Sequence, residues 1–468
     1  MLRGSPVAEL TKMLRRDSLG WAFAAVAAGG AAALVSGGVL GNLPALIFGL
    51  AALVGLMVAI AGDIRVGLVA MIIALSLDTA GRLITSPVTV TVYHMTLLAT
   101  LAIWALRLLS GDKRVRPRLS VVTLGFAALV LAAVFSLPLS MNQGATITAI
   151  IRLSFLLLFY LAFETFITDR GVARTVMIAL VGSAAFSSTL AFVQYRFPGL
   201  VLGVIHTQTS RLGAVLVRPG GFFSDPNYLG TFLSVAILAA MAEAMHAKRF
   251  RSMILWFAAA GVCSVGLVVT FSRTAWVGVA AGFIVLVLSS PKRRVPWLLG
   301  ASAAAVAVVL IVSPASVVSR FESITNVSSD KSIATRYLML GSTVDMIEDH
   351  WALGTGLGAF DVAYEPYRRA GSHTYIFKPH EVPLAMWAEM GIPGLIAEVL
   401  LVVGVFIEIR RRRHKGWNRY EAAGVAGLIA LLVQSLFQYY LYFEYLWLFF
   451  ALTVAATRFQ ASPEEVSS

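Results

Sequence analysis

Arginine side chains gather in two stretches of the sequence that separate long apolar runs. In chain order these arginines are Arg196, Arg211, Arg218, Arg320, Arg336, Arg368 and Arg369. A guanidinium group stays charged at any relevant pH and binds a phosphate through two parallel N–H groups. The two stretches therefore predict an anion-binding site, and a lipid diphosphate is a ligand that such a cluster suits.

Two further arginines stand close to or inside apolar runs. Arg273 is alone in a tight turn between two runs, and Arg152 lies within one. An ionisable residue inside a membrane span is costly and is a functional candidate by default. The simpler interpretation is that the arginines pair with carboxylates, such as Glu164, Asp225 and Glu389, or reach lipid headgroups. Both interpretations stay open at this point.

A histidine, His380, precedes a late apolar run and is followed directly by Glu381. Histidine is the side chain most easily poised as a base near neutral pH. His373, seven residues earlier, is a rival, and a lone loop histidine is commonly only solvated. The spacing alone therefore makes His380 a candidate base and nothing more.

The segment from Arg218 to Asn227 is rich in turn residues and leads into an apolar run. Asp225 or Asn227 is expected to cap the helix that begins there. The sequence has no HExxH motif and no cysteine pair, so it predicts neither a metal site nor a cofactor. Its single cysteine, Cys263, lies in an apolar run and is expected to be a small buried hydrophobe.

The composition places all of these residues in a membrane protein. Hydrophobic residues make up 58% of the 468 residues and charged residues only 13%, whereas a soluble domain is nearer one half and one quarter. The net charge of +13 does not indicate nucleic acid, because the Lys and Arg residues are scattered among short loops. Anionic membrane lipids remain suitable partners for part of this charge.

Apolar runs of about 17–25 residues predict 12–14 transmembrane helices. The runs lie near 21–40, 43–61, 64–80, 93–109, 119–140, 146–167, 173–195, 226–246, 252–270, 273–290, 295–313, 384–409, 418–437 and 440–457. The third, tenth and last runs are the least distinct. Alternate loops carry the Lys and Arg residues, which predicts a multi-pass inner-membrane protein with both termini in the cytoplasm.

The two long loops then face the opposite, non-cytoplasmic side. The first lies near 194–227, and the second, at 314–383, has helical periodicity from Ser332 to Glu348, with Ile333, Tyr337, Leu340, Val344 and Ile347 on one stripe. Loops of this length are usually functional. The predicted organisation is thus eleven spans within 1–313, a large loop at 314–383, and further spans with a short tail at 384–468.

Four short motifs occur in an order that resembles the O-antigen ligase and O-antigen polymerase superfamily of bacterial envelope glycosyltransferases. They are the Arg218 to Asn227 stretch, the Phe271-Ser-Arg273 turn, Arg336 followed by Gly354-x-Gly-x-Gly-x-Phe360, and His380 followed by Glu389, Gly391 and Gly394. The family usually has Asn after the histidine, where this chain has Glu381.

The resemblance implies a GT-C-like, all-α membrane glycosyltransferase that acts on the periplasmic face without a metal. Its donor would be a glycan on undecaprenyl diphosphate, and its acceptor a glycan or a lipid A-core-type molecule. Arg218 and Arg273 would bind the diphosphate, and His380 would accept the proton of the attacking hydroxyl in an inverting displacement. The further diphosphate-binding candidates are Arg211, Arg336 and Arg152, and the supporting residues are Asp225, Asn227, Glu381 and Glu389.

Other functions stay open. A ligase and a polymerase are not separated by the sequence. The protein could also be a transporter of a small anion or a lipid-linked substrate, and Arg152 is the residue that most favours that hypothesis. Transporters, however, tend to place polar sites near the midplane of repeated halves, and no internal repeat is visible. A non-catalytic scaffold would need neither His380 nor the arginines.

Overall fold

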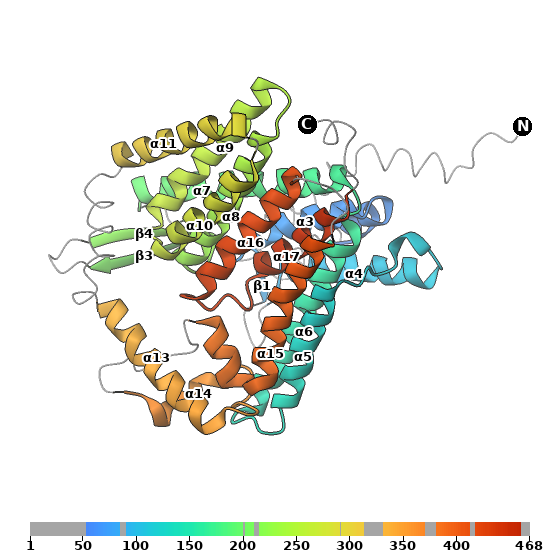
Figure 1. Ribbon diagram of the computed structural model, residues 1–468, viewed down its shortest axis with the longest axis vertical. Coiled ribbons are helices and arrows are strands. Elements are labelled where there is room, and N and C mark those ends of the chain that lie inside the picture. The colour runs from blue at the N-terminus through green and yellow to red at the C-terminus, as the bar shows by residue number, and fades with distance from the viewer. Residues whose placement is uncertain are drawn as a thin grey trace, which may run out of the picture.

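The computed structural model describes residues 53–84, 90–199, 202–209, 215–290, 292–312, 331–369, 381–411 and 417–459. The fold is all-α apart from two small antiparallel hairpins, as the sequence predicts (Figure 1). A helix at Leu53–Gly62 precedes α3. The other main helices are α3 (Arg65–Leu75), α4 (Val92–Leu109), α5 (Val121–Ser136), α6 (Gln143–Phe166), α7 (Arg170–Arg196), α8 (Pro226–Met245), α9 (Phe250–Val269), α10 (Arg273–Ser289), α11 (Val295–Val312), α13 (Lys331–His350), α14 (Phe360–Tyr364), α15 (Val382–Arg410), α16 (Arg419–Ser435) and α17 (Glu444–Thr457).

The apolar runs predicted from 64–80 onward coincide with these helices to within a few residues at most ends. By length and composition, six of the described helices are suited to cross a membrane: α4, α6, α7, α8, α9 and α15. The runs at 64–80, 273–290 and 440–457, which were the least distinct, form α3, α10 and α17, and all three are among the shorter apolar helices. The all-α polytopic class is confirmed, while the number of spans stays a prediction.

The centre of the bundle is α8, which is almost wholly buried because α7, α9, α10 and α16 pack around it. Polar side chains join α8 to α16. The Gln434 amide nitrogen donates to Ser234 Oγ at 3.1 Å, and Thr231 Oγ1 donates to Gln434 Oε1 at 2.7 Å. Hydrogen bonds of this kind stabilise helix pairs in an apolar surrounding. They fix the start of α8, which leads directly out of the Arg218 segment.

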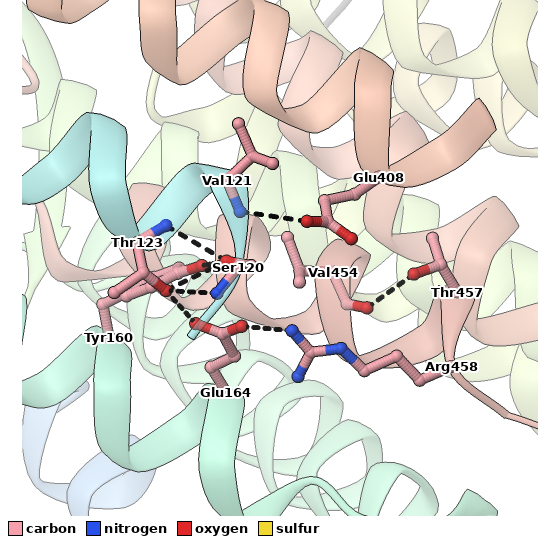
Figure 2. Close-up of polar contacts among 9 residues, drawn as sticks. All are labelled: Ser120, Val121, Thr123, Tyr160, Glu164, Glu408, Val454, Thr457 and Arg458. Carbon is pink, nitrogen blue, oxygen red and sulfur yellow. Dashed lines mark hydrogen bonds and ion pairs between the residues drawn. The ribbon is translucent and has the colours of Figure 1, made fainter. Parts of the chain in front are cut away.

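A buried polar cluster joins α5, α6, α15 and α17 (Figure 2). Arg458, the residue after α17, donates to Glu164 Oε1 of α6 at 2.6 Å, and Thr123 Oγ1 of α5 donates to Glu164 Oε2 at 2.7 Å. The backbone N–H of Val121 donates to Glu408 Oε1 of α15 at 3.0 Å. Glu164 is fully buried and thus pairs with Arg458, not with an arginine of the two long loops.

The helix predicted at Ser332 to Glu348 is confirmed as α13, but its predicted apolar stripe is wrong in part. Tyr337 is 63% exposed and Val344 38% exposed, whereas Ile347 of the same stripe is buried. The buried face also carries Met339 and Met346, which the stripe did not include. Met339 and Met346 pack with Phe360 and Tyr364 of α14, and α13 also lies against α15. The methionines, which adapt to irregular gaps, decide which face is buried.

Two hairpins interrupt the helices. β1 (Arg82–Ile84) pairs with β2 (Val90–Thr91), and β3 (Val204–Thr209) pairs with β4 (Val215–Gly221). The second hairpin falls in the loop predicted near 194–227 and carries Arg218. In Figure 1, β3 and β4 lie at the left edge of the view, and β4 packs against α7 and α8, while α13 and α14 lie at the lower end of the bundle, where they pack against α15.

Candidate active site

Arg218 lies on β4 and is held from two sides. Its Nε donates to the carbonyl of Thr270 at 2.9 Å, and its Nη2 donates to Asn227 Oδ1 at 3.0 Å. Thr270 ends α9, and Asn227 lies in the first turn of α8. Thr270 comes three residues before Arg273 in the chain, so the first of these bonds holds the Arg218 guanidinium group next to the segment that leads to Arg273. The structure thus brings Arg218 and Asn227 together with the turn that carries Arg273.

That turn has a strained backbone. Phe271 has φ = 52° and is the only non-glycine residue with positive φ in the part of the chain that the structure describes. Such a conformation costs about 1–3 kcal/mol and persists only when the surroundings impose it. The Phe271 side chain is buried and packs near Tyr195, with ring centroids 6.0 Å apart. The turn ends at Ser272, and α10 begins at Arg273.

Of the two residues expected to cap α8, Asp225 and Asn227, it is Asp225 that does so. Its Oδ1 accepts from the backbone N–H of Asn227 at 2.6 Å, and Pro226 occupies the first helical position. The side chain of Asn227 is then available to accept from Arg218. The two polar residues therefore have different roles. Asp225 sets the start of α8, and Asn227 orients Arg218.

The glycine segment and the start of α15 form one structural unit. Gly354, Gly356 and Gly358 all have positive φ, and Gly391 breaks α15 with φ = 64°. The Gly356 N–H donates to the Glu389 carbonyl at 2.8 Å, and the Gly358 N–H donates to Glu389 Oε1 at 2.9 Å. Glu389 is buried. It therefore holds the glycine segment against the break in α15.

Only glycine fits at two of these positions. A Cβ at Gly391 would collide with the carbonyl of Ala352, and a Cβ at Gly356 would collide with the Ser140 side chain. Gly356 has φ = 99°, a conformation that L side chains rarely adopt. The spacing of the two glycine motifs is thus explained by the close approach of residues 351–358 to α15 and to the turn before α6.

A tyrosine-rich loop, residues 436–443 between α16 and α17, connects the parts of the site and was missed in the sequence. Tyr439 donates to Glu389 Oε2 at 3.3 Å. The Tyr440 hydroxyl lies 2.7 Å from Thr231 Oγ1 of α8. The Arg152 guanidinium lies over the Tyr442 ring, 4.5 Å from its centroid. The run of tyrosines was a visible signal, but Tyr439 fell between two predicted apolar runs, and Tyr440 and Tyr442 fell inside the run at 440–457.

Arg152 and Arg336 lie on different helices and both interact with residues in or next to this loop. Arg152 of α6 interacts electrostatically with Glu444 at the start of α17, in addition to its contact with Tyr442. Arg336 of α13 interacts electrostatically with both Tyr440 and Glu381. The tyrosine-rich loop is therefore within electrostatic range of two predicted diphosphate-binding candidates.

Glu381 precedes α15 without capping it. Its Oε2 is buried and has no hydrogen-bond partner among the described residues. Burial raises the pKa of this carboxyl, and the charge of Arg336 opposes the shift. A carboxyl in this setting takes up a proton more readily than an exposed one.

Other predicted residues are accounted for differently. Arg211, Arg320, His373 and His380 lie outside the described residues. Arg369 pairs with Asp345 at 2.8 Å, and Arg368 with Glu365 at 3.4 Å. These last two arginines follow the simpler interpretation of paired charges. Among the residues that the structure describes, no group of three or more His, Cys, Asp or Glu side chains is arranged to hold a metal ion.

The fold and the site define an all-α polytopic membrane protein. Residues 258–399 match the family model described as O-antigen ligase. The match begins within α9 and ends within α15, so it includes the Arg273 turn, Arg336, the glycine segment and Glu389. It confirms the resemblance to the O-antigen ligase and polymerase superfamily and supports glycosyltransferase activity of that general type. Comparison with curated proteins finds no match.

Proposed function

We propose that the protein transfers a glycan from undecaprenyl diphosphate to an acceptor hydroxyl on the periplasmic face of the inner membrane. One observation carries the proposal. Arg218 is held by Thr270 and Asn227 beside the strained turn that starts α10 at Arg273. Two guanidinium-bearing residues from distant parts of the chain are thereby placed on neighbouring backbone segments.

The leaving group explains why arginines are suited to this site. A diphosphate gains negative charge as its bond to the sugar breaks, and fixed cationic donors stabilise that charge in the transition state. The hydrogen bonds to Thr270 and Asn227 hold the Arg218 guanidinium in one orientation before the substrate arrives. Arg218 and Arg273 would then supply the stabilisation that a divalent metal supplies in many glycosyltransferases. Arg211, Arg336 and Arg152 are further candidates for the same anion.

The proposed reaction is a direct displacement. The acceptor oxygen attacks the anomeric carbon while the bond from that carbon to the diphosphate oxygen breaks, and the diphosphate leaves with the bonding electrons. His380 takes the proton of the acceptor hydroxyl. Attack opposite the leaving group inverts the anomeric centre. Glu381, which is next to this histidine, is proposed to support it.

The remaining predicted residues are proposed to position the reactive ones. Asp225 and Asn227 set the start of α8 and the orientation of Arg218. Glu389 holds the glycine segment against α15. The topology, with both termini in the cytoplasm, rests on the Lys and Arg residues of alternate loops.

The test is a transfer assay in proteoliposomes with a lipid-diphosphate-linked oligosaccharide and EDTA. The native chain is expected to release undecaprenyl diphosphate, and His380→Ala is expected to fold but lose transfer. A ladder of products built without an added acceptor would indicate a polymerase, and a single addition to a lipid A-core-type acceptor would indicate a ligase. An inactive native chain that moves the intact donor across the bilayer would instead identify a transporter.

A further inference from the structure

A histidine that the sequence analysis did not single out lies beside Arg218. In the β3–β4 ladder, His206 is directly opposite Arg218. Directly opposed residues of an antiparallel pair point to the same face, with their Cβ atoms about 4.5–5.5 Å apart. His206 is exposed. Its imidazole ring is therefore accessible from the same side of the hairpin as the guanidinium group.

Both side chains also reach the same segment at the start of α8. His206 Nε2 lies 3.1 Å from the carbonyl oxygen of Ser224, and Arg218 Nη2 donates to Asn227, three residues further on. A carbonyl oxygen only accepts hydrogen bonds, so Nε2 must carry the hydrogen. The other ring nitrogen, Nδ1, then binds the second proton when the ring becomes charged. It has no hydrogen-bond partner among the described residues.

We propose that His206, as an imidazolium, donates from Nδ1 to the diphosphate of the lipid-linked donor next to Arg218. This inference rests on the proposed function. An ionised phosphate oxygen only accepts, so the charged ring binds it and the neutral ring does not. The donor would thus bind more tightly when the His206 ring carries the second proton than when it does not.

Charged groups also lie on the elements next to the β3–β4 hairpin. They are Arg218 on β4, Arg196 at the end of α7, Asp225 at the cap of α8 and Asp78, whose Oδ2 accepts from the Ser224 N–H at 3.1 Å. The two arginines favour an anionic ligand, and with the two aspartates this part of the molecule has charges of both signs before the diphosphate arrives.

The experiment compares His206→Gln with the native chain. A glutamine amide nitrogen can keep the hydrogen bond to the Ser224 carbonyl, but glutamine cannot become a cation. Thr207→Ala is the matched control, because Thr207 is exposed on the next position of β3 and points to the opposite face. Binding is measured in nanodiscs with a short-chain polyprenyl-diphosphate sugar, whose esterified phosphates do not titrate between about pH 5 and 8.

The native chain and Thr207→Ala are expected to bind this probe about three- to tenfold more tightly at the acidic end of the range, the gain of one exposed charge-assisted hydrogen bond. His206→Gln is expected to bind with the same weak affinity throughout. A native pH dependence in His206→Gln would overturn the inference and leave only a structural role for the ring. Arg218→Ala distinguishes a failure of this inference from a failure of the proposed function. If Arg218→Ala binds the probe with native affinity, the proposed diphosphate site itself is wrong.

Discussion

Replacing Glu389 tests whether this buried carboxylate is a structural support or a chemical participant. Its side chain is 2% exposed and accepts from the Gly358 N–H at 2.9 Å and from the Tyr439 hydroxyl at 3.3 Å. Glu389→Ala leaves two buried donors without acceptors, at about 1–3 kcal/mol each. The expected loss in the free energy of unfolding is therefore about 2–6 kcal/mol. Glu389→Gln keeps an oxygen for Gly358, and its expected loss is about 1 kcal/mol.

The assay has two readouts. The thermal unfolding midpoint in detergent is compared with that of Glu348→Ala, a control on the exposed side of α13. Glycan transfer is then measured for each folded variant. If Glu389 only positions the glycine segment, activity follows stability, and Glu389→Gln is close to native in both. A Glu389→Gln variant that unfolds normally but loses transfer would refute the positioning role, as would a Glu389→Ala variant as stable as the control.

Three further predictions concern other buried groups. Arg458→Ala leaves the charge of Glu164 buried without its partner and should cost about 3–5 kcal/mol of unfolding free energy; a midpoint equal to native would contradict it. Burial raises the pKa of Glu381, so this carboxyl takes up a proton on folding. The native chain should therefore lose stability relative to Glu381→Gln as pH rises from about 4 through the raised pKa. A difference in unfolding free energy between the two chains that stays constant across pH would contradict the shift. Gly356→Ala should lower the unfolding midpoint through its positive φ and a clash with Ser140, and Ser140→Gly in the same chain should recover only part of the loss; full recovery would show that the backbone conformation costs nothing.

The helices were predictable because lipid imposes a simple rule on sequence. A span needs about 20 apolar residues, and every backbone group must bond within the helix. The runs around α6, α8 and α9 satisfy that rule and match the structure closely. The glycine motifs were also visible, but their partner was not, because the contact of Gly356 with Glu389 joins residues far apart in the sequence.

The parts that the sequence did not reveal are short or have more than one partner. The β3–β4 hairpin has a β-branched signal in Val204, Ile205 and Thr207, but a two-stranded ladder is marginal alone and depends on its contacts with α7 and α8. The buried face of α13 is set by contacts with both α14 and α15, which periodicity along one helix cannot specify. The register that places His206 against Arg218 follows only from the folded hairpin.

In the proposed reaction, Arg218 and Arg273 stabilise the leaving diphosphate. The most direct test is the initial rate of glycan transfer in proteoliposomes for Arg218→Ala and Arg273→Ala, after the thermal unfolding midpoint of each variant is shown to equal that of the native chain. Arg114→Ala is the control, because the Arg114 side chain is 95% exposed in the turn between α4 and α5. We expect each of the two site variants to lose at least about 100-fold in rate, while the control keeps the native rate. Native rates in both site variants would contradict the proposed role of these arginines.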